Sequence, residues 1–257
     1  THRVHRETIR LRFENQQLIG DLTHRKAEAE NAARVKGLFL AGVSHDLKQP
    51  VRAISLYTGF LHRSDLQAMG EARLRDAVSK IDAAAGAIHS QISRLLELSR
   101  LESGAAPVHL GELDLTEQLH RMVELAGPDA QARGIELAVR TGPALHLTTD
   151  VRMLDSIVQN LLGNALKHAQ ATRVLVAVRR RRTGLRIEVR DNGQGIAPER
   201  LPQLFEAYRS FDDRHAGGDS HGLGLAIVRA QAGYLGAHIT VRSAPGRGSV
   251  FALEGLG

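Results

Sequence analysis

The 257-residue sequence contains no cysteine and no tryptophan, and aromatic residues make up only 4% of it. The lack of cysteine excludes a disulfide framework and a thiolate metal site. No apolar run approaches the roughly 20 residues that a helix needs to span a bilayer, and no signal peptide is visible. The chain starts at Thr1 inside a charged, helix-like pattern, so we expect it to be a piece of a longer protein.

Positive charge exceeds negative charge, with a formal net charge of +6 and a pI of about 10.1. The densest basic run, Arg179 to Arg182, lies between two stretches of alternating apolar residues. This pattern predicts a β-hairpin with its charges at the solvated end. No aromatic residues interleave the run, as base stacking would require, so nucleic-acid binding is not favoured.

The first hundred residues read as helices. Residues 1–36 are polar with sparse apolar points, which predicts a helical connector with a weak coiled-coil pattern, and residues 37–106 predict a helical hairpin with a turn near 65–70. The second helix carries apolar residues at alternating steps of three and four: Leu74, Val78, Ile81, Ala85, Ile88, Ile92 and Leu95. Such a hairpin has too little core of its own, so we expect it to dimerise into a four-helix bundle.

Residues 107–257 follow a linker, Ser103 to Pro107, and are richer in glycine. They alternate helix-like and strand-like segments. We expect helices near 115–133, 151–169 and 223–235, strands near 135–140, 145–148, 237–243 and 248–253, and a hairpin at 172–191. The whole chain is therefore expected to be α+β: a helical hairpin followed by an α/β sandwich with a mixed, largely antiparallel sheet.

His45 lies at an outward-facing position of the first hairpin helix when Leu40, Leu47, Ile54 and Leu61 are taken as a core row. In this position along the helix, the side chain of His45 is not expected to belong to the hydrophobic core. With Asp46 beside it, His45 is free to take part in chemistry.

A second polar set lies on the helix expected at 151–169, where Asn160, Asn164, Lys167 and His168 share one face. An amide oxygen suits Mg²⁺ shared with phosphates, and a lysine one turn away suits a phosphate. The alternative is a merely polar helix face, although asparagine is a poor helix former.

Two glycine-containing motifs follow. Asp191 comes directly after a strand and precedes Gly193, Gly195 and Ile196. The glycines would let the backbone approach a flat ligand, and the carboxylate could accept a hydrogen bond from an exocyclic amine; the alternative is an ordinary tight turn.

The second motif, Gly222-Leu223-Gly224, opens an apolar helix. Bare N–H groups at a helix start favour an anion. The alternative is glycine-mediated helix packing.

Together, these motifs resemble the sensor histidine kinases of two-component systems. Residues 160–167 resemble that family's N box, Asp191 to Ile196 its G1 box, Leu204-Phe205-Glu206 its F box, and Gly222 to Gly224 its G2 box. Ser44 to Pro50 resembles the H box. The resemblance covers about residues 35–253, and five motifs in family order make it specific.

The resemblance implies a Bergerat-type ATP-binding fold for residues 107–257. It implies that Asn164 is the Mg²⁺ ligand and Asn160 its support, and that Lys167 and His168 reach phosphates. Asp191 would read the adenine amine, with Gly193, Gly195 and Ile196 beside it. Gly222, Leu223 and Gly224 would flank the triphosphate.

The resemblance also implies ATP-dependent phosphorylation of His45, with Asp46 orienting the ring, and transfer to an aspartate of a response-regulator receiver domain. Hydrolytic relatives carry a glutamate where this chain has Asn160, which disfavours attack by water. Gln49 departs from the family's usual Thr or Asn. It could hold a water for phosphatase activity, or only contact the partner.

Two other functions compete with this interpretation. One is a dimeric ATP-binding pseudokinase scaffold, disfavoured by the intact His45, Asp46, Asn164 and Asp191. The other is a gyrase- or chaperone-type ATPase, disfavoured by Asn160 and the H box. We expect a homodimer in the cytoplasm, belonging to an inner-membrane sensor only through segments outside this sequence.

Overall fold

The structure is a computed structural model. It describes residues 16–20, 22–23, 25–26, 30, 37, 42, 44, 47–62, 70–142, 145–182, 184–206 and 222–257. His45, Asp46, most of the predicted connector and most of the predicted turn lie outside the described residues, as does 207–221.

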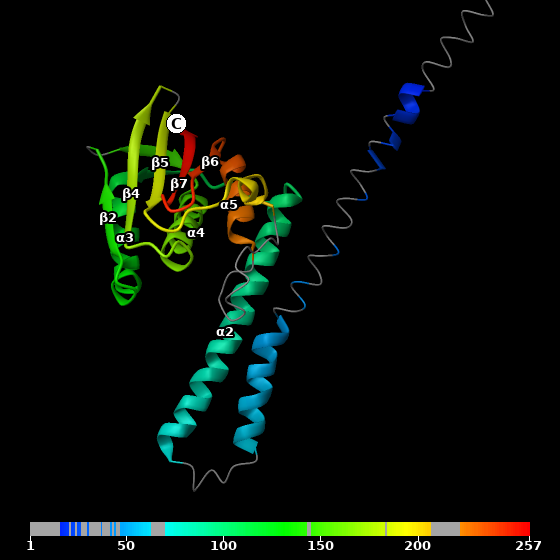
Figure 1. Cartoon of the computed structure of the whole chain (residues 1–257), viewed down its shortest axis with the longest axis vertical. Coiled ribbons are helices and arrows are strands. Elements are labelled where there is room, and N and C mark those ends of the chain that lie inside the picture. The colour runs from blue at the N-terminus through cyan, green and yellow to red at the C-terminus, as the bar shows by residue number, and fades with distance from the viewer. Residues whose placement is uncertain are drawn as a thin grey trace, which may run out of the picture.

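A helical hairpin forms the first part of the described chain. Residues 47–62 are helical and run beside α2 (Glu71–Glu102) in the opposite direction (Figure 1). The two helices touch through Nζ of Lys80, which lies 5.4 Å from the ring centroid of Tyr57. Gly104, with φ of +72°, follows the end of α2, where a left-handed residue commonly terminates a helix. The predicted hairpin is therefore confirmed.

The inner face of α2 differs from the predicted seam. Its buried residues are Ala77, Ala84, Gln91, Leu98 and Leu101, while several seam residues stay open to solvent in the single chain, including Leu74, Val78 and Ile92. Ala77 lines a cavity together with Leu56, Tyr57 and Phe60 of the first helix, where its small side chain lets the two backbones approach closely. The larger apolar side chains of Leu74, Val78 and Ile92 therefore remain available for a contact outside this hairpin.

The remaining residues form a sandwich of helices on a sheet. The sheet has the order β2-β4-β5-β7-β6; β2 pairs with β4 in parallel, and the other pairs are antiparallel. The strands are β2 (Glu136–Arg140), β4 (Arg173–Arg181), β5 (Gly184–Asp191), β6 (His238–Ser243) and β7 (Ser249–Leu256). The helices are α3 (Leu115–Ala132), α4 (Val151–Lys167) and α5 (Gly224–Tyr234). The predicted mixed, largely antiparallel sheet and the hairpin at 172–191 are confirmed.

Two short elements were not predicted. β1 (Gly111–Asp114) pairs antiparallel with β3 (His146–Thr149) in a separate two-stranded sheet, and η1 (Pro198–Gln203) is a 3-10 helix. β1 has a single buried residue, Leu113, so its four residues are too few to show an alternating pattern.

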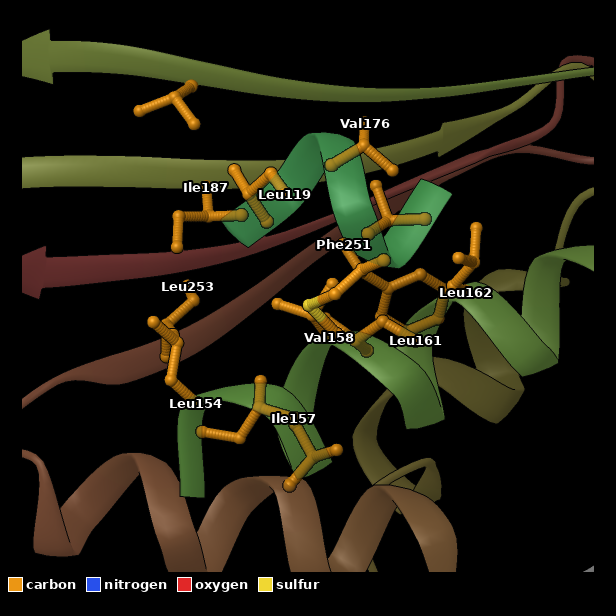
Figure 2. Packing of buried hydrophobic residues seen from close by; sticks show 14 of the residues in the cluster. Leu119, Leu154, Ile157, Val158, Leu161, Leu162, Val176, Ile187, Phe251 and Leu253 are labelled. Atoms are coloured by element: carbon orange, nitrogen blue, oxygen red, sulfur yellow. The ribbon is translucent and has the colours of Figure 1, made fainter. Parts of the chain in front are cut away.

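The core lies between the helices and one face of the sheet (Figure 2). Leu154, Val158 and Leu161 of α4 point toward Leu253 and Phe251 of β7 and are all buried. Their spacing of three and four places them on one side of α4. The polar residues of α4 consequently lie on its other side, where they can meet a ligand.

The opposite face of the sheet carries an ionic cluster. Nε of Arg186 lies 2.6 Å from Oε1 of Glu188, and its Nη1 lies 2.6 Å from Oε1 of Glu254. Arg190 also donates to Glu188, and Glu188 is only 2% exposed. Burial would raise the pKa of Glu188, but hydrogen bonds from Arg190 and Arg186 outweigh it and lower the pKa.

Candidate functional site

Helix α4 is held at its start by Asp150. The buried Asp150 carboxylate accepts hydrogen bonds from the backbone N–H groups of Arg152 and Met153, at 3.0 and 3.2 Å. Its other oxygen accepts from the N–H of His109, at 2.7 Å. This N-cap therefore fixes α4 and ties the segment after α2 to it.

The predicted polar face of α4 is present. Asn160, Asn164 and His168 are half-buried and Lys167 is exposed, on the side away from the buried leucines. None of the described residues hydrogen-bonds the side chain of Asn164. An amide oxygen in this position, completed by phosphate oxygens and water, fits the ligand set that Mg²⁺ prefers.

Asn160 joins α4 to the start of α5. Its Nδ2 donates to the carbonyl of Ser156 at 2.8 Å, which orients the amide. A β-carbon built on Gly224 would lie 2.8 Å from Oδ1 of Asn160. The Asn160 segment and the Gly222–Gly224 segment, 62 residues apart, are thus brought together.

Asp191 lies at the end of β5, where its carboxylate is partly withdrawn from solvent. Its Oδ1 accepts from the N–H of Gly193 at 2.9 Å and from the N–H of Ser249 at 3.2 Å. Burial raises the pKa of Asp191, and these hydrogen bonds only partly oppose the rise. Ser249 was not predicted as part of the site, because it lies 58 residues away and carries no local signal.

The glycines after Asp191 serve the protein's own packing. A β-carbon on Gly193 would collide with the carbonyl oxygen of Ala169, and one on Gly195, with φ of +70°, would collide with that of Ala244. The sequence suggested that these glycines make room for a ligand. The structure shows that they also let the loop lie against two neighbouring backbone segments.

The same loop is fastened to the end of α4 by Gln194. Its N–H donates to the carbonyl of Ala169 at 2.8 Å, and its Nε2 donates to the carbonyl of His168 at 3.0 Å. The N–H of Ile196 donates to Oγ of Ser243 at 2.8 Å. The Asp191 loop and the polar end of α4 therefore form one surface, and sequence reasoning missed the part played by Gln194.

Leu223 is a packing residue. It is 1% exposed and clusters with Leu98 and Leu101 of α2 and Ile227 of α5. The glycine motif thus starts α5 and also anchors it to the helical hairpin, as Figure 1 shows for α2 and α5.

The hairpin's predicted site residues are only partly described. His45 and Asp46 lie outside the described residues, while Gln49 is exposed on the helix of residues 47–62. Within the described ranges, no group of three or more His, Cys, Asp or Glu side chains could hold a metal ion. No helix in those same ranges is long and apolar enough to cross a membrane.

Two family models match the chain. Residues 35–104 match the His Kinase A phospho-acceptor domain, and residues 149–254 match the histidine kinase-, DNA gyrase B- and HSP90-like ATPase. Together they cover both halves of the described architecture.

Individual relatives agree with these models. The chain is 30% identical over 243 residues to the signal transduction histidine-protein kinase AfsQ2 of Streptomyces coelicolor, covering 91% of this chain and 44% of AfsQ2. It therefore spans less than half the length of that relative.

Two solved structures have the same fold. Full-length ShkA in complex with AMPPNP is 27% identical, with a TM-score of 0.64 over 79% of this chain and 45% of ShkA. Histidine kinase ThkA, in complex with the response regulator protein TrrA, is 18% identical, with a TM-score of 0.60 over 87% of this chain and 62% of that one. The phosphoacceptor match, the ATPase match and these likenesses agree, and the chain belongs to the sensor histidine kinases.

Proposed function

We propose that this chain binds ATP, phosphorylates His45 and passes the phosphoryl group to an aspartate of a response-regulator receiver domain. The observation that carries the proposal is the position of Asn160. It occupies the place of the hydrolytic relatives' general base. Its amide Nδ2 donates to the carbonyl of Ser156, and its Oδ1 lies where a side chain on Gly224 would collide with it. An amide cannot take a proton from water at neutral pH, so the site favours another nucleophile.

In this proposal the nucleotide lies between the Asp191 loop and the polar face of α4. Asp191 accepts a hydrogen bond from the adenine amine, and Gly193, Gly195 and Ile196 shape the loop. Asn164 holds Mg²⁺, which when bound neutralises phosphate charge. Lys167 and His168 contact phosphates, and Gly222, Leu223 and Gly224 form the edge nearest the triphosphate.

The transfer step uses His45 as the nucleophile. A neutral imidazole nitrogen attacks the γ-phosphorus, and the bond from that phosphorus to the bridging oxygen breaks, so ADP leaves with the electron pair. The imidazole proton passes to Asp46. The chain's other site residues contribute by positioning the γ-phosphate relative to the imidazole.

Dimerisation is the second part of the proposal. Apolar side chains stay open on both hairpin helices, including Leu56 at 65% and Val78 at 52% exposure. The chain's second copy would cover them in a four-helix bundle. We assign residues 1–36 to the connector, 37–106 to this dimerisation hairpin and 107–257 to the ATP-binding domain.

We propose the location and the partner from the resemblance to relatives of the same family. ThkA is described in complex with a response regulator, and we propose an equivalent receiver as the phosphate acceptor here, with this chain acting in the cytoplasm. We propose no nucleic-acid partner and place any membrane anchor in segments outside the sequence.

A phosphatase activity is a second candidate, and the exposure of Gln49 favours it. Gln49 follows His45 by four residues in the sequence, the spacing that brings two side chains to one face of a helix, and we propose that its amide holds a water in line with the phosphoryl group. Gln49→Ala should slow dephosphorylation of the phosphorylated receiver and leave His45 phosphorylation intact. An unchanged dephosphorylation rate would leave Gln49 as a contact for the partner.

The kinase proposal is tested with γ-labelled ATP and Mg²⁺. Wild-type protein should form an acid-labile, base-stable phosphoprotein that His45→Gln abolishes. His62→Gln is the matched control, because His62 is an exposed histidine of the helix at residues 47–62. No label on the wild type would overturn the proposal in favour of the scaffold, and free phosphate without label would favour the ATPase.

A further inference from the structure

The contact between α2 and α5 contains two polar interactions inside an otherwise apolar cluster. Nε2 of Gln231 donates to Oε1 of Glu97 at 2.7 Å, and the hydroxyl of Tyr234 donates to the carbonyl of Leu101 at 3.0 Å. They lie beside the cluster that contains Leu98 and Ile227. The ATP-binding domain is therefore attached to the second hairpin helix by both apolar and polar contacts.

One polar atom in this contact lacks a partner. Gln231 is 2% exposed, and its Oε1 makes no hydrogen bond within the described structure. A buried acceptor left unpaired destabilises the state that buries it, because it has lost its hydrogen bond to water. An ionised Glu97 cannot relieve this cost, because a carboxylate is only an acceptor.

A protonated Glu97 has the missing donor. A carboxylic acid carries one O–H donor and one carbonyl acceptor, and a primary amide carries N–H donors and one acceptor. The two groups can form a ring of two hydrogen bonds, with Gln231 Nε2 donating to Glu97 as observed and the acid O–H donating to Gln231 Oε1. We propose that Glu97 and Gln231 form an acid–amide latch that docks the ATP-binding domain on α2 more firmly when Glu97 is protonated.

The charges around Glu97 are consistent with this latch. Burial raises the pKa of Glu97, and the hydrogen bond from Gln231 and the nearby Arg94 guanidinium only partly oppose the rise. From α5, Arg229 and Tyr234 line a cavity of about 610 Å³ next to the contact, together with Glu102 of α2. The positive charge of Arg94 favours the ionised form of Glu97, but the effect of burial on the pKa is larger.

The sign of the pH effect follows by linkage. The docked state binds the Glu97 proton more tightly than an undocked, solvated Glu97 does, so lowering the pH favours docking. The added docking strength is complete below the ordinary glutamate pKa of about 4.3. It is lost as the pH rises through the raised pKa of the docked state.

The test measures domain separation and does not depend on kinase activity. Because the chain has no cysteine, Ser79→Cys on α2 and Gln131→Cys on α3, both exposed, can carry spin labels. The doubly labelled chain is diluted with unlabelled chain, so that distances within one chain dominate. Pulsed electron paramagnetic resonance then gives the docked fraction from about pH 4.5 to pH 8, a range that begins just above the ordinary glutamate pKa and covers higher values, toward which burial raises the pKa of Glu97.

We expect the docked fraction of the wild type to fall as the pH rises. Glu97→Gln supplies a permanent donor and should stay docked at every pH, while Gln231→Leu should be less docked and insensitive to pH. Glu71→Gln, an exposed carboxylate at the far end of α2, should behave as the wild type. A wild type whose distances do not change with pH, or a Glu97→Gln chain that follows the wild-type curve, would overturn the latch.

Discussion

Gly224 packs directly on Asn160: a β-carbon on Gly224 would lie 2.8 Å from Oδ1 of that asparagine. The contact joins the first residue of α5 to the middle of α4, and both residues belong to the proposed nucleotide site. A change at Gly224 should therefore act on the nucleotide through the Asn160 amide.

Gly224→Ala should weaken nucleotide binding. The added methyl group forces the Asn160 amide away from its position, and we expect a loss of affinity of about tenfold, or ~1.4 kcal/mol. Calorimetry with a non-hydrolysable ATP analogue measures it. Gly233→Ala on the same helix is the matched control, because nothing lies within 4 Å of a β-carbon there; an equal loss in both variants would refute the explanation.

Asp191→Asn should abolish most adenine recognition while keeping the loop folded. Asparagine Oδ1 can still accept from Gly193 and Ser249, but an NH₂ group then replaces the oxygen that would accept from adenine. Losing a hydrogen bond to a charged group costs about 1.5–3 kcal/mol, so ADP affinity should fall by about 10- to 150-fold. Asp129→Asn, an exposed residue of α3 paired with Arg133, should leave ADP affinity unchanged.

The pH dependence of nucleotide affinity should report Asp191. Because burial raises its pKa, the carboxylate is protonated at a higher pH than an ordinary aspartate, whose pKa is about 3.9. Affinity should therefore be full above the raised pKa and fall as the pH decreases through it. Binding titrations of the wild type and Asp191→Asn should converge at low pH, and parallel curves would argue against this role.

Glu188→Gln should destabilise the ATP-binding domain. Removing the charge leaves the nearly buried Arg186 with Glu254 alone, and breaking a buried ion pair costs about 3 kcal/mol or more. Urea unfolding followed by circular dichroism gives the free energy of unfolding. Glu136→Gln, whose pair with Arg173 is exposed, should cost only about 0.5 kcal/mol.

Because the pKa of Glu188 is lowered in the folded protein, the stability of the ATP-binding domain should decrease in acid. Its contribution is present above the ordinary glutamate pKa and is lost as the pH falls through the lowered folded value. Glu188→Gln should therefore lose less stability on acidification than the wild type does.

Asp150→Ala should loosen the junction between the two parts of the chain. It removes an N-cap, at a cost of about 1–2 kcal/mol, and also the bond to the N–H of His109. Hydrogen exchange should accelerate at residues 109, 152 and 153. If exchange accelerated only at residues 152 and 153, the backbone N–H of His109 would be held by other contacts.

Most of the architecture was predictable because it rests on local periodicity. The steps of three and four in α2 and the apolar side of α4 are visible in the sequence, and the hairpin at 172–191 follows from alternation around a basic turn. β1 was missed, because four residues with one buried leucine carry no period. The motifs of the site were found for the same reason: each is a short local pattern.

The contacts between distant segments could not be predicted. Nothing near Ser249 indicates that its N–H reaches Asp191, and nothing near Gln231 indicates Glu97, since each pair is brought together only by packing. The need for glycine at positions 193 and 195 likewise became visible only from the positions of Ala169 and Ala244, whose carbonyl oxygens a side chain there would meet.

The sequence by itself thus determined the longer helices and strands, the family motifs and the chemical identity of each site residue, because these depend on neighbours within a few positions. Only the tertiary structure decided which polar groups share one site, which glycines exclude a side chain, and which carboxylates are buried. Those properties depend on distances between residues that are far apart along the chain, and burial is what shifts the pKa values of Asp191 and Glu97.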